Sequence, residues 1–236
     1  MKLFYCYTDS QDRLRTQYFL PTLPLEFETH AFYCPAQGSG DYLTPDYVDC
    51  LHFKVHKILE TLERHAGEVF VWSDIDILFF KNPIDDLQSL LEQSGKDVLF
   101  QREGPRIEYL NPGFLVCRAT EELRGFYRRI LGKMHRNPSL HDMFAANELI
   151  QKGDPVRWGY LPMRYYLRTH GWPPPRDTVI YHANFTSGRD AVGQKIRQFE
   201  EILWVRKWGY PALLWSCAKR APGKVFRMVT GERKKL

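Results

Sequence analysis

The chain has 236 residues, 44% of them hydrophobic and 14% aromatic, so it can bury the core of one large domain, and no apolar run reaches the roughly 18 residues of a membrane-spanning helix. Its five cysteines are widely spread and never form a Cys-x-x-Cys pair, which argues against a disulfide framework or a zinc knuckle and favours a reducing compartment. The formal net charge is +5, but outside the C-terminus the basic residues are scattered among acids, which argues against nucleic-acid binding.

Hydrophobic periodicity predicts alternating strands and helices. A first strand covers 2–7, an amphipathic helix covers 47–64, and an apolar strand then leads to aspartates at 74 and 76. The later patterns predict helices at 85–93, 121–135, 142–151 and 192–204, and strands at 97–101, 113–118 and 179–182. This alternation is typical of an α/β sandwich with a mainly parallel sheet. We expect one domain over 1–215, followed by a basic tail over 216–236.

The most informative segment is the apolar run from Val69 to Phe80, which holds Asp74 and Asp76 one residue apart. On a strand, residues i and i+2 face the same side about 7 Å apart, so the two carboxylates are expected to point together. Hard cations such as Mg²⁺ and Mn²⁺ take carboxylate oxygens and keep positions open for phosphate. Asp-x-Asp is more often a solvated turn, but burial among apolar neighbours would require a compensating cation or hydrogen bonds.

Several other polar residues stand at the predicted ends or beginnings of strands. In an open α/β sheet, ligands bind beyond the carboxyl ends of the strands. This rule groups distant residues: Asp9, Ser10, Asp74, Asp76, Asn111, Gly113, His182 and Asn184. Plainer interpretations exist, with Asp9 capping a turn, residues 111–113 forming an ordinary turn and His182 serving as a core histidine. We expect the group to share one cleft.

Four segments carry a family resemblance. The stretch from Lys54 through Trp72-Ser73-Asp74-Ile75-Asp76 to Lys81-Asn82-Pro83 resembles the donor-site segment of the nucleotide-diphospho-sugar transferases of GT-A fold, close to glycosyltransferase family 77. Similar motifs follow in the same order: Asn111-Pro112-Gly113-Phe114, the helix 142–150, and Tyr181-His182-Ala183-Asn184 with Gly188 and Lys195. The resemblance covers about residues 2–200. It implies a Rossmann-like three-layer α/β/α sandwich with a mainly parallel central sheet.

The resemblance also implies an activity, namely retaining transfer of a sugar from a nucleotide diphosphate sugar, with uridine diphosphate as the expected carrier. The acceptor would be a glycan, a lipid-linked sugar or a protein. Asp76 would bind Mn²⁺ or Mg²⁺ directly, Asp74 would bind the cation or the donor ribose, and His182 would be the third protein ligand. Further donor-binding positions would be Thr8, Asp9, Ser10, Lys54, Asn111, Gly113, Asn184, Gly188 and Lys195. The candidate catalytic carboxylates are Asp142 and Glu148.

The sequence departs from the family at one position. The Gln that usually follows the acid at 142 is replaced by Met143, which cannot hydrogen-bond a sugar hydroxyl. The acceptor geometry or the donor sugar is therefore expected to differ from the family's usual one. Asp142 is also compatible with a plain helix N-cap, and Glu148 does not complete a capping box. Retention needs either a carboxylate nucleophile or a path in which the leaving diphosphate takes the acceptor proton, and both paths stay open.

Two other function classes compete with a transferase. A phosphohydrolase with an aspartyl nucleophile also carries Asp-x-Asp after an apolar strand, but it expects Thr or Val where Leu78 stands, and it lacks a second acidic pair at a useful distance. A nucleotide-sugar or glycan binding module without turnover is the second alternative. Met143 and the many Tyr and Trp side chains that could stack on sugars are compatible with it.

The basic residues of the C-terminus follow an aromatic stretch. Between 219 and 235 the chain holds seven of them, Lys219, Arg220, Lys224, Arg227, Arg233, Lys234 and Lys235, after Trp204, Trp208, Tyr210 and Trp215. This combination is compatible with an anionic membrane surface, and a solvated basic tail is the simpler alternative. The N-terminus opens directly into the first strand without a charged leader and apolar signal core. We therefore expect a cytoplasmic protein that is peripheral, at most, to the inner membrane face.

Overall fold

The computed structural model describes residues 1–36, 38–41, 44–168, 174–186 and 188–230. Its central feature is a six-stranded sheet with the strand order β2-β1-β3-β6-β5-β7. The strands are β1 (Lys2–Tyr7), β2 (Glu28–Tyr33), β3 (Val69–Ser73), β5 (Val98–Gly104), β6 (Ile107–Arg118) and β7 (Trp158–Tyr160). β6 runs antiparallel to both of its neighbours, and every other neighbouring pair in this sheet is parallel. The predicted mainly parallel sheet is confirmed.

A smaller, three-stranded sheet lies beside the main one, with the order β4-β9-β8. It is formed by β4 (Ile77–Phe79), β8 (Tyr165–Leu167) and β9 (Ile180–His182). β4 pairs antiparallel with β9 in the register Ile77 opposite His182. The chain therefore leaves the main sheet after β3 and enters the small sheet at β4, and the two predicted acids lie at this transition.

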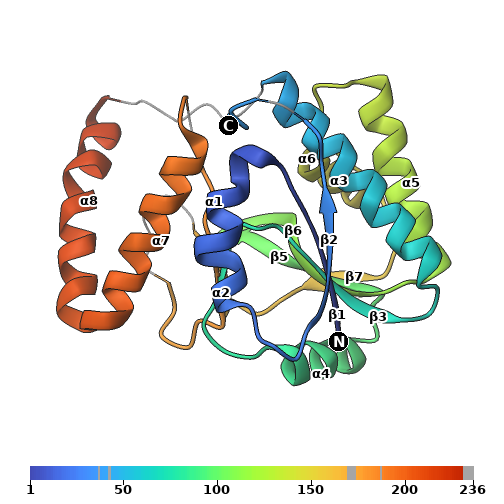
Figure 1. Cartoon of the computed structure of the whole chain (residues 1–236), viewed down its shortest axis with the longest axis horizontal. Helices are drawn as coiled ribbons and strands as arrows, with labels where there is room; N and C mark the ends of the chain where they lie inside the picture. The colour runs from blue at the N-terminus through green and yellow to red at the C-terminus, as the bar shows by residue number, and fades with distance from the viewer. Residues whose placement is uncertain (37, 42–43, 169–173, 187, 231–236) are drawn as a thin grey trace.

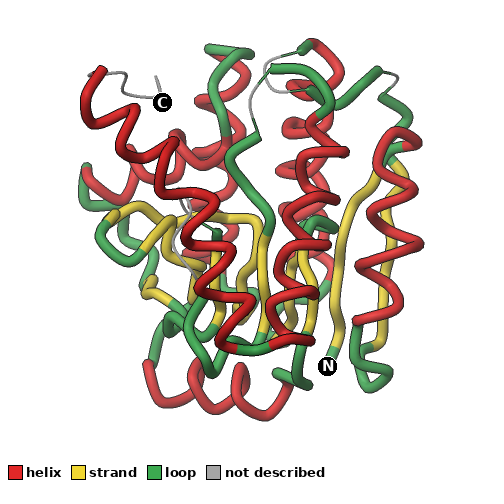
Figure 2. Tube along the Cα trace, turned by 90° about the vertical axis from the view of Figure 1, so that its left-hand side faces the viewer, coloured by secondary structure: helices red, strands yellow, loops and turns green. Residues whose placement is uncertain are grey.

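Helices cover both faces of the main sheet (Figures 1 and 2). One face carries α3 (Pro45–Arg64), α5 (Glu121–Arg136) and α6 (Asp142–Gln151). The other carries α4 (Ile84–Ser94), α7 (Ala191–Trp208) and a short helical stretch made of η1 (Asp9–Gln11), α1 (Asp12–Leu14), η2 (Arg15–Phe19) and α2 (Leu20–Thr22). A last helix, α8 (Tyr210–Thr230), packs against α7 at one end of the molecule.

Each face of the main sheet has its own hydrophobic core, because side chains alternate along the buried strands. In β3, Phe70 and Trp72 face the helices α3, α5 and α6, while Val71 faces the opposite layer. The amphipathic pattern of α3 buries Val55 and Ile58 in the same core as Phe70 and Trp72. Two cores on opposite faces of one sheet define the three-layer α/β/α architecture.

The strongly periodic helices match their predictions, and so does the short strand β9, whereas several other elements were not predicted. β1 and α6 have the predicted bounds, while α3, α4, α5 and α7 differ by a few residues at their ends. β2 escaped prediction because it is an exposed edge strand with polar residues, and β7 and β8 have only three residues each. The helical stretch 9–22 was also missed.

The helix α8 crosses the predicted boundary between domain and tail at residue 216, and residues 231–236 of that tail lie outside the described residues. In the described part of the chain, no helix combines the length and the apolar character that a membrane span requires. The division of the chain into 1–215 and 216–236 stays a prediction.

An ion pair at the edge of the main sheet joins a buried carboxylate to an exposed guanidinium group. The carboxylate of Asp97 is almost fully buried and accepts hydrogen bonds from the backbone N–H, Nε and Nη2 of Arg157, at 3.0, 3.2 and 2.7 Å. Burial raises the pKa of Asp97, but the bonds from Arg157 outweigh it, so the net pKa lies below its ordinary value. The charge therefore stabilises the fold above the ordinary carboxyl pKa, and this contribution is lost as the pH falls through the folded-state pKa.

We expect Asp97→Asn to lower the free energy of unfolding at pH 7 by about 1–2 kcal/mol, a modest value because Arg157 is exposed to solvent. Urea unfolding at pH 7 and at pH 3 measures this, and the difference between wild type and variant should shrink at pH 3. Glu26→Gln, at an exposed acid, serves as the control. An equal difference at both pH values would contradict the assignment.

Candidate active site

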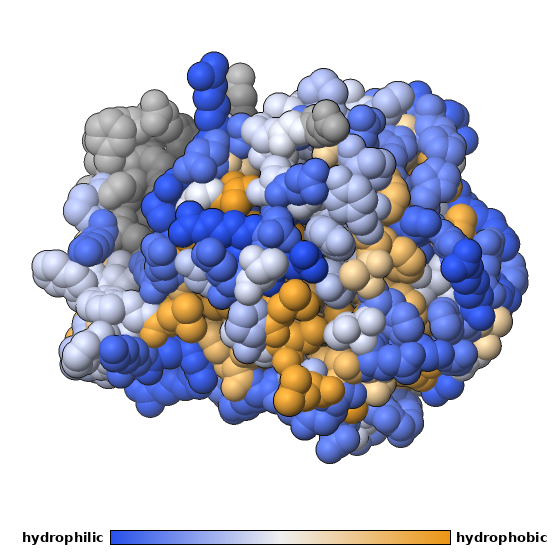
Figure 3. Space-filling view, viewed as in Figure 1, coloured by the Kyte–Doolittle hydropathy of each residue, from blue (hydrophilic) through white to orange (hydrophobic). Residues whose placement is uncertain are grey.

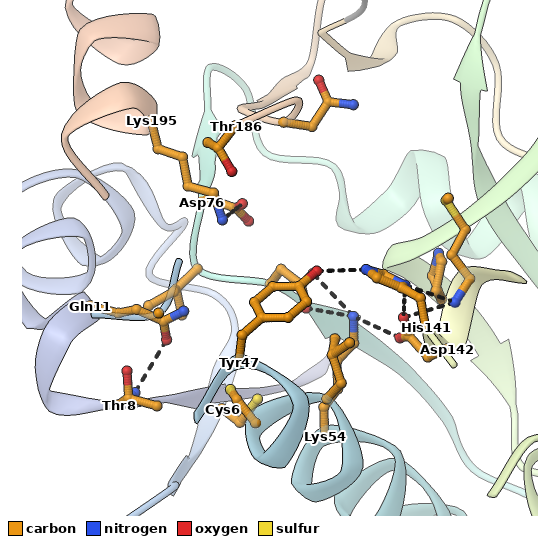
Figure 4. A pocket seen from close by; sticks show the side chains of 18 of the residues that line it. Cys6, Thr8, Gln11, Tyr47, Lys54, Asp76, His141, Asp142, Thr186 and Lys195 are labelled. Carbon is orange, nitrogen blue, oxygen red and sulfur yellow. Dashed lines mark hydrogen bonds and ion pairs between the residues drawn. The ribbon is translucent and has the colours of Figure 1, made fainter. Parts of the chain in front are cut away.

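A cavity of about 340 Å³ opens where β1 and β3 end, between the start of α3, the start of α6 and the loop after β9 (Figure 4). Most of the predicted site residues line it. These are Thr8, Ser10, Lys54, Asp74, Asp76, Asn111, Asp142, His182, Asn184 and Lys195. The antiparallel direction of β6 explains the presence of Asn111: Phe114 pairs with Ser73 at the end of β3, so Asn111, three residues earlier in β6, lies just beyond that end. Residues that the carboxyl-end rule grouped from distant parts of the chain therefore do lie in one cleft.

Asp74 and Asp76 do not lie on a strand, as the alternation argument assumed, but in the bend between β3 and β4. Backbone bonds hold this bend: the N–H of Asp74 donates to the carbonyl of Gly113 at 2.6 Å, and the N–H of Ala183 donates to the carbonyl of Asp76 at 2.9 Å. One ligand atom each from Asp74, Asp76 and His182 lies within 4.8 Å of the other two. The chain turn between two sheets, rather than the pleat of one strand, brings the acids together.

The imidazole of His182 has a defined orientation. Its Nδ1 lies 2.7 Å from Oε1 of Gln101, whose own amide nitrogen donates to the carbonyl of Tyr165 at 3.3 Å. Because Oε1 of Gln101 can only accept, Nδ1 of His182 carries the proton. Nε2 therefore faces the acids, 3.1 Å from Oδ1 of Asp76. This is the arrangement in which a second polar group orients a histidine as a metal ligand.

Two lysines from helices on opposite sides of the sheet neutralise the acids. Lys195 of α7 places Nζ 2.7 Å from Oδ2 of Asp76, and Lys54 of α3 places Nζ 3.0 Å from Oδ1 of Asp74. Burial raises the pKa of Asp76, but Lys195 and His182 outweigh burial, and the net pKa is lowered. For Asp74 burial dominates over the opposing effect of Lys54, and the pKa is raised. Neighbouring acids thus differ in their tendency to hold a proton.

The donor set of this centre fits a divalent cation. Oδ1 of Asp76 is buried and accepts no hydrogen bond in the described part of the chain, although it lies 3.1 Å from Nε2 of His182. A carboxylate oxygen and an unprotonated ring nitrogen repel each other at that distance, so either a second proton on His182 or a cation must lie between them. Two carboxylates with one imidazole suit Mn²⁺ or Mg²⁺ better than a soft metal.

At the other end of the cavity, Asp142 is held by several groups at once. Its Oδ2 lies 3.3 Å from Nζ of Lys54, and its Oδ1 lies 2.7 Å from Nδ1 of His141 and accepts the N–H of Met143 at 2.8 Å. Burial raises the pKa of Asp142, but the opposing effects of Lys54 and His141 are larger together. The net pKa therefore lies below its ordinary value. The N-cap of α6 is His141 rather than Asp142, which is the first helical residue. Asp142 is thus an ionised group of the cavity wall.

Four predicted site residues do not line the cavity. Asp9 accepts a hydrogen bond from the hydroxyl of Tyr33 at 2.9 Å, and Gly188 is a turn residue at φ +67°. Glu148 points away from the cavity and forms ion pairs with Lys133 and Lys152 on the outside of α6, at 2.8 and 2.7 Å. Gly113 lies behind the wall, where it leaves room for the side chains of Asp74 and His182.

Sequence reasoning missed several cavity residues. The hydroxyl of Tyr47 lies 2.6 Å from Nε2 of His141, and this pair extends the polar wall beyond Asp142. Glu103, also in the wall, accepts a hydrogen bond from the amide of Asn111 at 2.7 Å. Gln101 does not line the cavity but orients His182, and because it ends the predicted strand 97–101, the carboxyl-end rule could have identified it. Tyr47 and His141 left no such signal, because they lie at helix starts whose relative position depends on tertiary packing.

Comparison with known protein families and solved structures supports the same class of protein that the cavity suggests. A sequence profile described as nucleotide-diphospho-sugar transferase matches residues 25–199, and the chain therefore belongs to this family. A comparison with curated protein sequences gives no match. The fold is that of the GT-A glycosyltransferases, and the chain is a nucleotide-sugar glycosyltransferase by family and fold.

Solved structures with the same fold share little sequence with this chain. One is a glycosyltransferase involved in glycosylation of the major capsid of PBCV-1, with 12% identity, a TM-score of 0.54, and coverage of 84% of this chain and 98% of that one. The galactosyltransferase LgtC, solved with donor and acceptor sugar analogues, has 13% identity, a TM-score of 0.52, and coverage of 86% and 95%. The glycosyltransferase GlyE of Streptococcus pneumoniae has 11% identity, a TM-score of 0.51, and coverage of 85% and 64%.

The position of Gly113 leads to a prediction. A Cβ at this position would lie 2.4 Å from Cε1 of His182 and 2.8 Å from Oδ2 of Asp74, so Ala must displace these two side chains. We expect Gly113→Ala to lower the free energy of unfolding by about 1–3 kcal/mol. The rise in melting temperature on addition of Mn²⁺ should also disappear, because the displaced ligands no longer converge.

Gly132→Ala provides the matched control. Gly132 lies inside α5, where the added Cβ would approach only the side chain of Arg136, at 3.7 Å, and where Ala favours the helix by roughly 0.5–1 kcal/mol. Differential scanning fluorimetry with and without Mn²⁺ compares the two variants. A Gly113→Ala protein with the wild-type melting temperature and Mn²⁺ response would contradict the proposed crowding.

Proposed function

We propose that this protein is a metal-dependent, retaining glycosyltransferase that uses a uridine diphosphate sugar and transfers the sugar to a glycan, a lipid-linked sugar or a protein. The supporting observation is the convergence of Asp74, Asp76 and His182 within 4.8 Å, at a cavity that also contains Lys54 and Lys195. Mn²⁺ or Mg²⁺ would be held by the three ligands. When bound, the cation supplies positive charge that stabilises the departing diphosphate.

The side chains of the cavity have distinct roles in this proposal. Lys195 lies beside Asp76 and is half-buried at the cavity wall, so its ammonium group would bind a phosphate oxygen of the donor. Thr8 and Ser10, whose hydroxyl oxygens lie 3.0 Å apart after β1, would contact the ribose or the base. Asn111 and Asn184 supply amide groups for the sugar. These contacts would orient the glycosidic bond and exclude water from it.

Asp142 is the candidate catalytic carboxylate, because it is buried, lines the cavity and is kept ionised by Lys54 and His141. It would serve either as nucleophile towards the anomeric carbon or as the group that orients the acceptor while the leaving diphosphate takes the acceptor proton. Met143, Tyr47 and His141 would then form the acceptor side, which explains how the cavity can function without the family's usual Gln. Glu148 has no part in this mechanism.

We expect Asp76→Asn to reduce Mn²⁺-stimulated release of nucleoside diphosphate from the donor by about 100-fold or more, because one charged ligand is lost. Asp85→Asn, at an exposed acid outside the cavity, should leave the rate unchanged. Turnover is measured by chromatography of the released nucleotide, and thermal unfolding verifies that both variants are folded.

Ligand binding and nucleotide release together distinguish a transferase from a binding module. A panel of nucleotide sugars with and without Mn²⁺ identifies the donor by the rise in melting temperature, since a ligand of the native state stabilises it by mass action. A wild-type protein that binds a nucleotide sugar but never releases the nucleoside diphosphate would be a binding module. Full activity of the Asp76→Asn protein would reject the metal assignment.

We further propose that the C-terminal helices contact an anionic membrane, at the inner face of a cytoplasmic location. Six large apolar side chains are 40–59% exposed on α7 and α8: Leu203, Trp204, Trp208, Tyr210, Leu214 and Trp215. Cations lie over some of these rings, with Lys207 at 5.5 Å from Trp208 and Lys219 at 5.4 Å from Trp215. Over α8, at the left edge of the space-filling view, pale side chains adjoin strongly hydrophilic ones (Figure 3). Interfacial aromatics with neighbouring cations are typical of peripheral membrane surfaces.

We expect the double variant Trp208→Ser/Trp215→Ser to bind vesicles containing phosphatidylserine about 10-fold more weakly than wild type, as measured by co-sedimentation. Binding of both proteins should weaken as the salt concentration rises. Tyr109→Ser, at an exposed aromatic on β6, is the matched control and should bind as wild type does. Equal sedimentation of all three proteins would refute the membrane contact.

A further inference from the structure

Three histidines gather on the outside of the α3 and α5 layer, away from the cavity. His52 and His56 stand one helical turn apart on α3, where residues i and i+4 share a face. His135 lies in the last turn of α5, which packs alongside α3 (Figures 1 and 2). The centroid of the His135 ring is 5.8 Å from that of His52 and 5.6 Å from that of His56. Both His56 and His135 are exposed.

These spacings are close to those of a metal site with imidazole ligands. A zinc ion lies 2.0–2.1 Å from each ring nitrogen, which places each ring centroid about 3 Å from the ion and two tetrahedral ligands about 5 Å apart. The observed centroid distances of 5.6 and 5.8 Å exceed this value by less than 1 Å. The rings of His52 and His135 are stacked, with 14° between their planes, and those of His56 and His135 are tilted by 42°. Binding would therefore require the exposed side chains of His56 and His135 to rotate until three ring nitrogens face one ion.

The surroundings of His52 favour metal binding. Its Nε2 lies 3.3 Å from the backbone carbonyl of Pro138, and because a carbonyl only accepts, Nε2 carries the proton. Nδ1 is then the unprotonated nitrogen, and a ring N–H bound to a carbonyl is the usual support of a metal-ligating histidine. Burial, followed by repulsion from His135 and His52, lowers the pKa of His56. Neutral imidazoles are the form that binds metal.

Nearby lysines do not oppose a cation strongly, because acids pair with them. Nζ of Lys57 lies 2.7 Å from Glu60, and Nζ of Lys133 lies 2.8 Å from Glu148. We propose that His52, His56 and His135 form a second metal site, which takes a divalent transition-metal ion such as Zn²⁺ through three imidazole nitrogens and is separate from the aspartate-rich centre. An ion there would link α3 to α5. Since α3 carries Tyr47 and Lys54 into the cavity, the ion would also stiffen one wall of the active site.

Calorimetric titration with Zn²⁺ tests this proposal independently of activity. Wild type should bind at least one Zn²⁺ that His135→Gln and His56→Gln each lose or bind about 10-fold more weakly, as expected when one of three ligands is removed. Both residues are exposed, so these variants should fold. His30→Gln, at a partly exposed histidine paired with Glu28, is the matched control and should bind as wild type does.

A second measurement distinguishes the two centres. Electron paramagnetic resonance of bound Cu²⁺ should show hyperfine coupling to several nitrogens in wild type and in His30→Gln, and to fewer nitrogens in His135→Gln. The aspartate-rich centre contributes a single imidazole, so it cannot produce the wild-type signal. Identical Zn²⁺ stoichiometry and affinity in wild type and His135→Gln would overturn the proposal, as would a Cu²⁺ signal with one nitrogen throughout. If the Cu²⁺ signal shows one nitrogen throughout, the favourable interaction of a histidine with the C-terminal end of the α5 dipole would be enough to explain why His135 stands there.

Discussion

The site depends on one constraint: the negative charge of two neighbouring carboxylates must be compensated. Asp74 and Asp76 lie in a bend between two sheets, where burial alone would raise the pKa of both. Each acid has its own lysine, Lys54 from α3 for Asp74 and Lys195 from α7 for Asp76. These helices lie on opposite faces of the main sheet, so the ion pairs tie both outer layers of the sandwich to the same bend.

The same compensation explains why the cavity suits a charged ligand. Polar side chains of the wall are held by second groups, with His182 bound to Gln101 and Asn111 bound to Glu103. A pre-organised wall of this kind loses little entropy when a ligand binds. In the proposed reaction, Lys195 would exchange its contact with Asp76 for a phosphate oxygen of the donor, and Asp76 would then be free to hold the cation.

Two further proposed surfaces lie at opposite ends of the molecule. The helices α7 and α8, which carry the exposed aromatics, lie at one end, and α3 and α5, which carry the histidines, lie towards the other (Figure 1). The first would set the orientation of the cavity relative to a membrane, and the second would stabilise the helix that carries Lys54. Neither surface overlaps the cavity, so variants in each can be examined without changing the residues that would bind the donor.

The sequence by itself determined the fold class and a set of site residues of which most line the cavity, because hydrophobic periodicity and the carboxyl ends of strands are local properties of the chain. It also identified the acids, His182 and Lys195, although by the wrong geometry: tertiary structure brings the acids together in a bend between β3 and β4 rather than on one strand. Tertiary structure alone decided that Asp142 faces the cavity while Glu148 faces outward, since six residues along a helix turn a side chain to a different face, about 120° from the first. It also decided the contacts of Tyr47 with His141, because these residues are 94 positions apart and meet only when α3 packs beside α6.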